Sequence, residues 1–317
     1  MLNLVKDIVN PKNWLKLLKD PKKIKNFINR LKYYPGLKFA YSKSRFYRYL
    51  EIFFLIKLAK KNKAFQNFFF NTNNEKFENF RFLFDPINNI NKNQEKCLSH
   101  CGIIILENIL EAQDYKHIKD LIDNISDEND NLDKNVVGNA HVKKILKNIK
   151  IDEKHLLISI SNKITQAVYG APVKPSISVL TSIPKKIPES DVPGDNIYHV
   201  DRYLPNIKMF YYPDDIKLGE GHFDFALGSH KIDYQYLKFF NNNEQWIFDE
   251  RNPNSKKFTK FKTEITVKKN SLIVACTNGF HRRSKFTIFK KRNVLTFLYP
   301  AFNFSSLINF KKYNNYF

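Results

Sequence analysis

The stretch YHVDRYLPNIKMFYYPDDIKLGEGHFDFALGSHK, residues 198–231, decides the fold. Its short apolar or alternating runs are separated by Pro, Asp and Gly, which is the pattern of strands joined by tight turns. Similar runs precede and follow it: SISVLTSI, NIYHVD, TEITVK, SLIVACT and RNVLTFLYP. Because no helix-length amphipathic run separates these strands, the pattern predicts an antiparallel sandwich or jelly roll and not a parallel sheet.

The region in front of these strands mixes helix with strand. GIIILENIL, which begins at Gly102, predicts a buried strand, and EAQDYKHIKDLIDNI predicts an amphipathic helix. A second helix is expected over about 153–169, and the polar stretch 126–135 is expected to be a loop. We therefore predict a mainly β, α+β domain over 96–317, in which a helical front part, about 96–170, precedes a cupin-like double-stranded β-helix.

Residues 1–95 form a separate, basic region. The first 70 positions hold 17 Lys or Arg against three acidic residues, and apolar residues recur at helical spacing. The favoured interpretation is a helical extension that packs its apolar stripe on the neighbouring domain and leaves its lysines in solvent. Peripheral membrane contact of residues 1–70 is the alternative, and no specific nucleic acid is expected as a partner.

Composition limits the class of protein further. The net charge of +22 accompanies abundant Lys, Asn, Ile and Phe, which AT-rich codons favour, so codon bias explains much of it. Three cysteines give no disulfide framework and indicate a reducing, cytoplasmic location. Cys97, His100 and Cys101 lack a second half of a zinc site, so a structural role is expected for them. The longest apolar patch, residues 49–59, is too short to span a membrane.

The chemistry is expected at YHVD. Residues two apart in a strand point to the same face, so His199 and Asp201 can present an imidazole and a carboxylate together. One further histidine would complete a facial triad, which leaves open metal positions for a chelating keto acid and dioxygen. His281 is the candidate, because it follows the strand SLIVACT and the Asn278-Gly279 turn.

Arg292 lies eleven residues after His281 and opens the strand RNVLTFLYP. A guanidinium near the metal can form a bidentate pair with the far carboxylate of 2-oxoglutarate. A His-x-Asp pair alone is a weak signal. The ordered set of His-x-Asp, the Gly-Ser-His turn at 228–230, His281 and Arg292 is much more specific.

Residues 198–231 resemble the corresponding stretch of the phytanoyl-CoA dioxygenase family, in which a His-x-Asp pair is followed by a strand, an acidic turn, a Gly-containing hairpin and Gly-Ser-His. The family's distal histidine matches His281, and its 2-oxoglutarate arginine matches Arg292. The opening CLSHCGIIILENIL resembles the family's entry strand, so the resemblance covers about 97–300. Relatives often carry a small hydroxyl residue two positions after the distal histidine. This chain has Arg283 there, which leaves Ser284 as a further candidate contact for 2-oxoglutarate.

The resemblance implies an Fe(II)- and 2-oxoglutarate-dependent dioxygenase that consumes dioxygen and hydroxylates a C–H bond of a small or carrier-linked metabolite. The basic surface would suit an anionic substrate, but codon bias explains the lysines equally well. Asp201 argues against halogenation, since related halogenases have Ala or Gly at that ligand. The alternative is a catalytically inactive jelly-roll binding protein that uses its basic arm on membrane or nucleic acid. Intact candidates at all four positions favour the enzyme.

Overall fold

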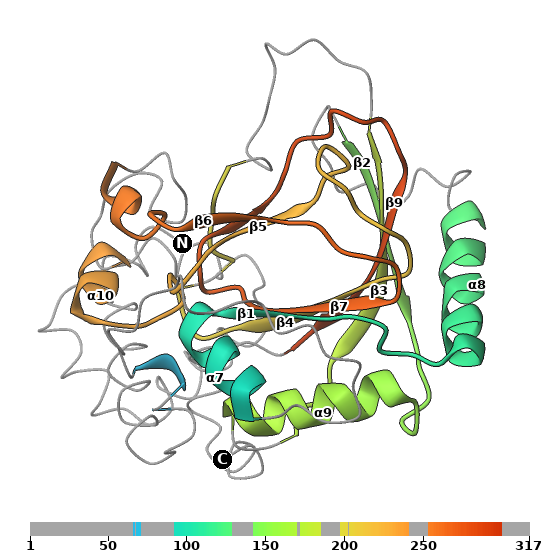
Figure 1. The fold of residues 1–317 in the computed structure, drawn as a ribbon, viewed down its shortest axis with the longest axis horizontal. Coiled ribbons are helices and arrows are strands. Elements are labelled where there is room, and N and C mark those ends of the chain that lie inside the picture. The colour runs from blue at the N-terminus through green and yellow to red at the C-terminus, as the bar shows by residue number, and fades with distance from the viewer. Residues whose placement is uncertain are drawn as a thin grey trace, which may run out of the picture.

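The computed structural model describes residues 66, 68–70, 92–128, 142–169, 172–184, 197–201, 203–240 and 253–299. Two antiparallel sheets face one another and enclose an interior, seen end-on in Figure 1. The larger has the order β1-β7-β4-β9-β3-β2 and the smaller β6-β5-β8. The strands are β1 (Ile103–Leu106), β2 (Val142–Ile149), β3 (Ser176–Pro184), β4 (Ile207–Tyr212), β5 (Phe223–Ala226), β6 (Lys262–Ile265), β7 (Ser271–Cys276), β8 (His281–Arg283) and β9 (Arg292–Leu298).

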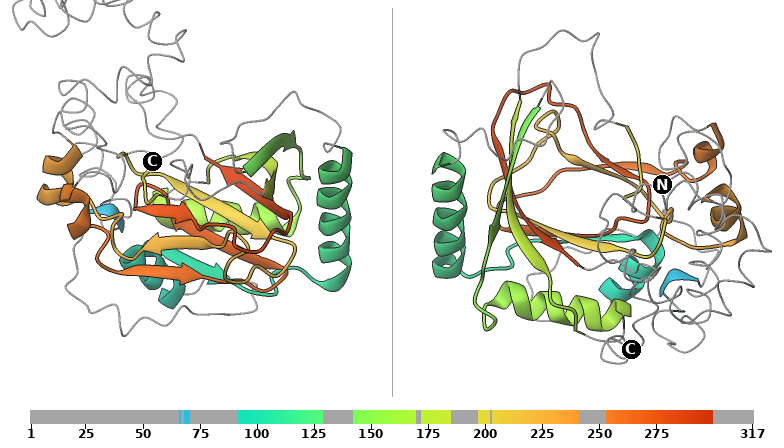
Figure 2. Two further views of the ribbon diagram at one scale, coloured as in Figure 1. Left: turned by 90° about the horizontal axis from the view of Figure 1, so that it is seen from above. Right: turned by 180° about the vertical axis from the view of Figure 1, so that it is seen from behind.

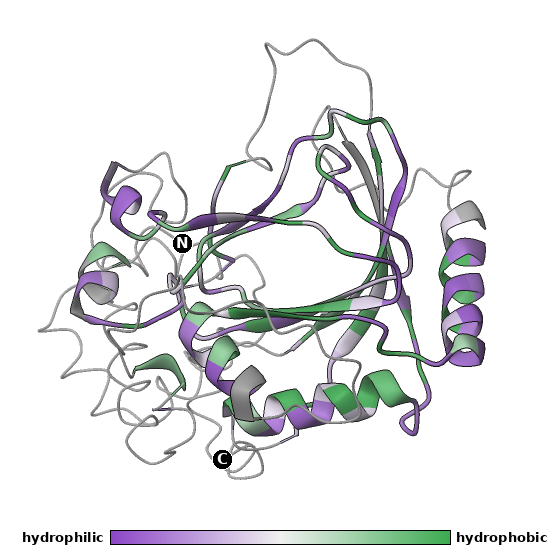
Figure 3. Ribbon diagram, in the orientation of Figure 1, coloured by the Kyte–Doolittle hydropathy of each residue, from purple (hydrophilic) through white to green (hydrophobic). Residues whose placement is uncertain are grey.

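The helices lie outside the sheets. They are α7 (Lys92–Cys101), α8 (Ala112–Glu128), α9 (Leu156–Tyr169) and α10 (Tyr234–Phe240), with a 3-10 turn η6 (Pro253–Lys257). Figure 2 shows α8 and α9 against the outer side of the larger sheet. Asn293 of β9 bonds to Ser126 of α8 at 3.1 Å, which identifies the outer face of β9. Apolar residues dominate the buried strands β1 and β7 in Figure 3.

Register then identifies the inner face of the larger sheet. Asn293 faces outward, and side chains alternate along a strand, so Arg292 and Thr296 face inward. Phe210 of β4 pairs with Thr296 and therefore shares the inner face, together with Lys208 and Tyr212 on the same strand. This interior face carries the residues that matter for the site.

The predicted fold class is confirmed, with local differences. YHVD forms a single bridge at His199 instead of a regular strand, because the chain bends immediately after it. The predicted loop 126–135 begins in helix, since α8 continues to Glu128. Strands β2 and β8 and helices α7 and α10 were not anticipated, because their periodicity in the sequence is weak. The expected helices of residues 1–95 fall almost entirely outside the described residues, so that region and the division at residue 95 stay predictions.

Candidate metal centre

His199 and His281 are fixed to one another by main-chain pairing. The amide of His199 donates to the carbonyl of His281, and the amide of His281 donates to the carbonyl of His199, both at 2.9 Å. His281 opens β8, which pairs with β5, so the bridge attaches His199 to the smaller sheet. The two imidazole centroids are 4.8 Å apart. The bend that interrupts regular strand at YHVD thus still sets both rings side by side.

The same ring nitrogen is occupied in each histidine. Nδ1 of His199 lies 2.9 Å from the carbonyl oxygen of Ile197, and Nδ1 of His281 lies 2.9 Å from that of Gly279. A carbonyl can only accept, so Nδ1 carries the proton in both rings. Nε2 of each neutral ring then keeps its lone pair, which is the form a metal-binding histidine takes.

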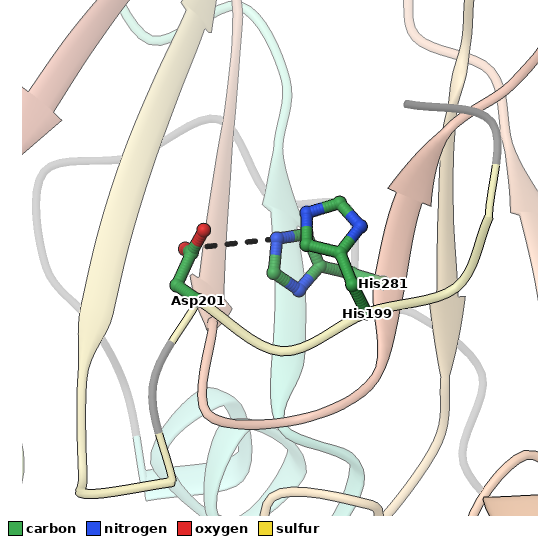
Figure 4. Close-up of side chains that lie close together, drawn as sticks. All are labelled: His199, Asp201 and His281. Carbon is green, nitrogen blue, oxygen red and sulfur yellow. Dashed lines mark ion pairs between the residues drawn. The ribbon is translucent and has the colours of Figure 1, made fainter. Parts of the chain in front are cut away.

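Asp201 completes the group. Its amide donates to the carbonyl of Thr277 at 3.0 Å, which fixes the chain beside β7. Figure 4 shows its carboxylate turned toward the imidazoles, and Oδ2 is 3.6 Å from Nε2 of His281. One donor atom each from His199, Asp201 and His281 lies within 4.8 Å of the others. Two neutral imidazoles and one carboxylate fit a divalent first-row metal, which needs its donors roughly 3 to 3.4 Å apart, so a small contraction would suffice.

Electrostatics favour the metal-binding forms of these side chains. Burial lowers the pKa of His281 to about 4 against the opposing attraction of Asp201, so its imidazole is neutral near pH 7. Burial by itself would raise the pKa of Asp201, but the Lys208 ammonium and His281 outweigh it and hold that pKa well below its usual range. The carboxylate is therefore ionised. Nothing in the sequence pattern had identified Lys208 of IKMFYY as a residue of the site.

Aromatic rings form one wall of this group. Phe223 of β5 stacks on the imidazole of His281 with ring centroids 5.6 Å apart. The rings of Phe210 of β4 and Phe223 have their centroids 5.4 Å apart. Phe223 is buried and Phe210 is partly exposed. The rings hold the imidazole in place and exclude water from one of its faces.

Arg292 is buried on the inner face at 6% exposure. Its Nη1 donates to the carbonyl of Gly221, while Nε and the hydroxyl of Ser182, its cross-strand neighbour, have no hydrogen-bond partner among the described residues. Burial lowers the pKa of Arg292, and Tyr212 opposes this shift. A buried guanidinium without a carboxylate is costly, which points to an anionic ligand.

Ser284 lies at the end of β8. Its amide donates to the carbonyl of His222 at 2.8 Å, so Ser284 and Arg292 both attach to the consecutive residues Gly221 and His222. From His222 the chain continues into β5, where Phe225 pairs with His281. Gly221 therefore lies four residues before the residue that pairs with His281, on the segment that leads into β5.

The other candidate ligands do not join this group. Cys97 and Cys101 are buried in α7 with their sulfurs 3.9 Å apart, and His230 belongs to the turn after β5. Within the described ranges, His199, Asp201 and His281 form the single group of three such residues close enough to hold a metal. None of the described helices is long and apolar enough to cross a membrane.

No protein-family model and no curated protein matches the sequence. Among solved structures, the non-haem, alpha-ketoglutarate-dependent carbocyclase SnoK from nogalamycin biosynthesis aligns at a TM-score of 0.50 and 14% identity, over 68% of this chain and 86% of SnoK. The chain has the fold of SnoK. Iron-bound EctD from S. alaskensis aligns at a TM-score of 0.43 and 13% identity, over 68% of this chain and 79% of EctD.

HygX from Streptomyces hygroscopicus, with nickel and 2-oxoglutarate bound, aligns at a TM-score of 0.42 and 10% identity, over 66% of this chain and 86% of HygX. At such identities the SnoK alignment establishes the fold alone. The jelly roll predicted from the strand pattern is thereby confirmed. The resemblance to the phytanoyl-CoA dioxygenase family stays a prediction.

Proposed function

We propose that this protein is an Fe(II)- and 2-oxoglutarate-dependent oxygenase with His199, Asp201 and His281 as metal ligands. The observation that carries the proposal is the orientation of the two imidazoles. Both donate Nδ1–H to main-chain carbonyls and so leave Nε2 to bind a metal, and one ring nitrogen of each lies within 4.8 Å of the Asp201 donor atom. The shared fold of SnoK, a non-haem, alpha-ketoglutarate-dependent carbocyclase, supports the same function.

Arg292 is proposed to bind the far carboxylate of 2-oxoglutarate. Its Nε and the nearby Ser182 hydroxyl are buried donors without partners among the described residues, and a carboxylate would satisfy both. Ser284 is a further proposed contact, because its amide is tied to His222 beside the Gly221 carbonyl that Arg292 binds. Together they would fix the orientation of the co-substrate.

When bound, Fe(II) with 2-oxoglutarate and dioxygen supplies an oxidant that can remove hydrogen from an unactivated C–H bond. The residues of this chain orient the ligands and exclude water. Main-chain bonds hold His199 and His281, and Phe223 covers one face of the His281 ring. We propose hydroxylation of a small or carrier-linked metabolite as the reaction.

The test measures conversion of 2-oxoglutarate to succinate by the full-length protein with Fe(II) and oxygen. Wild type should form succinate only when both are present, and His199→Ala should form none. His155→Ala is the control, because His155 bonds to the start of α9 and lies outside the metal group. A wild-type protein that neither binds metal nor consumes 2-oxoglutarate would instead support the inactive binding protein.

A further inference from the structure

The backbone of Lys208 is fixed beside the metal group. Lys208 is the second residue of β4, and its backbone pairs with Ala275 of β7 on one side and Leu298 of β9 on the other. Its Nζ is 2.7 Å from Oδ2 of Asp201. Because the backbone lies in a central strand of a six-stranded sheet, the fold keeps the base of this side chain within reach of the carboxylate, while the ammonium can still change its partner.

The ammonium occupies the oxygen that a metal ion needs. Oδ2 of Asp201 is the atom that lies 3.6 Å from Nε2 of His281. A metal bound at about 2.1 Å from Oδ2 would lie no more than about 5 Å from Nζ of Lys208. Two cations that close together repel one another, so Lys208 and the metal compete for one carboxylate.

Nothing else in the described part of the chain neutralises Lys208, since Asp201 is the single carboxylate within ion-pair distance of its Nζ there. The side chains of Lys208 and Asp201 are 24% and 23% exposed, so a dissolved ligand can reach the ammonium. Arg292 already has a proposed ligand in 2-oxoglutarate. Lys208 is therefore, besides Arg292, a second cation on the inner face. Once a metal binds Asp201, Lys208 needs another anion as its partner.

We propose that Lys208 couples metal binding to an anionic ligand. This inference rests on the proposed function of the triad. In the metal-free protein the ammonium pairs with Asp201 and weakens metal binding. When a metal binds, the ammonium turns its three donors to a carboxylate or phosphate group. That anion belongs either to 2-oxoglutarate or to the substrate, in which case the substrate carries its anionic group close to the carbon that reacts.

The experiment titrates the metal-free, full-length protein with Co²⁺ by calorimetry, alone and with 2-oxoglutarate or inorganic phosphate. Lys208→Met removes the charge and keeps the length of the side chain. Without an anion it should bind Co²⁺ roughly tenfold tighter than wild type, because one close positive charge is gone. An anion should strengthen Co²⁺ binding by a larger factor in wild type than in Lys208→Met, since such coupling is reciprocal.

Two further variants sharpen the result. Lys268→Met removes another ion-paired lysine, one that is 74% exposed and contacts Glu107 at 3.2 Å, and it should bind Co²⁺ as wild type does. Lys208→Arg keeps the charge and should keep both the weak binding and the response to an anion. The anion that shows the larger difference between wild type and Lys208→Met identifies the source, 2-oxoglutarate or a phosphate-bearing substrate.

Equal or weaker Co²⁺ binding by Lys208→Met would overturn the proposal and leave Lys208 as a residue that orients Asp201. An equal response of wild type and Lys208→Met to both anions would also overturn it. Failure of the proposed function has a different signature, because wild type and His199→Ala would then bind Co²⁺ alike. If wild type binds Co²⁺ through the triad and Lys208→Met changes nothing, the coupling alone is wrong.

Discussion

His199 and His281 exchange two main-chain hydrogen bonds of 2.9 Å each, and their imidazoles stand side by side with centroids 4.8 Å apart. The pairing involves only backbone atoms, so it persists when either side chain is changed. The scaffold of the candidate metal centre is therefore separable from its ligands. Substitution at these positions can test metal binding without testing the fold.

Metal binding should stabilise the wild-type protein and not His199→Ala. A ligand present at a hundredfold its dissociation constant stabilises the native state by about 2.7 kcal/mol. Thermal unfolding with and without Co²⁺ measures the difference. His199→Ala should unfold near the metal-free wild-type temperature under both conditions, and His155→Ala should respond as wild type does. Equal stabilisation of His199→Ala would exclude that residue as a ligand.

Replacement of Arg292 should separate co-substrate binding from metal binding. Arg292→Met should weaken binding of 2-oxoglutarate to the Co²⁺-loaded protein by about a hundredfold, since a charge-assisted pair is lost. Co²⁺ affinity should change little. The metal-free protein should be as stable or more stable, because the change removes a buried guanidinium whose Nε has no hydrogen-bond partner within the described ranges.

Calorimetry and urea unfolding measure these effects. Arg283→Met is the matched control, because Arg283 lies on β8 in the other sheet, over the ring of Phe286, and carries the same charge. The proposed role of Arg292 fails if both variants bind 2-oxoglutarate equally well.

His230 should make the protein less stable in mild acid. Burial, with Lys231 and His100 nearby, holds its pKa well below the ordinary value, while Nε2–H donates to the Ser99 carbonyl. Below about pH 6.5 the unfolded chain binds a proton at this histidine that the folded protein does not bind. The free energy of unfolding is therefore highest above that pH and decreases as the pH falls below it. In urea unfolding between pH 7.5 and 5, the free energy of unfolding of His230→Gln should decrease less with falling pH than that of wild type.

The control for this prediction is His117→Gln, because His117 is exposed on α8 and is hydrated in both folded and unfolded chains. It should leave the pH dependence unchanged. An identical slope for wild type and His230→Gln would mean that another group carries the acid sensitivity.

Gly102 should not tolerate alanine. It joins α7 to β1 with φ of 85°, and a Cβ built there would lie 2.5 Å from Nδ1 of His230. Gly102→Ala should cost about 2 kcal/mol or more in unfolding free energy, from backbone strain together with the clash. Ser176→Ala, at an exposed position that opens β3, should cost far less in the same urea titration. Similar losses for both variants would contradict this account.

The sequence by itself determined the class of fold and the candidate ligands. Short apolar runs with turn residues between them specify antiparallel strands. A period of two predicted one shared face for His199 and Asp201, where the structure has a single bridge followed by a bend. The apolar run before the Asn278-Gly279 turn put His281 at the rim of a strand, and in the structure His281 opens the short strand β8. These are local signals, because each depends only on neighbours in the chain.

Tertiary structure alone decided how the segments meet. The ion pair between Lys208 and Asp201, the stacking of Phe223 on His281 and the bond from Arg292 to Gly221 all depend on strand order and register. Register between distant strands is set by the packing of the whole core, which no local pattern encodes. For that reason the sequence could name the three candidate ligands, but only the folded chain revealed the lysine that forms an ion pair with one of them.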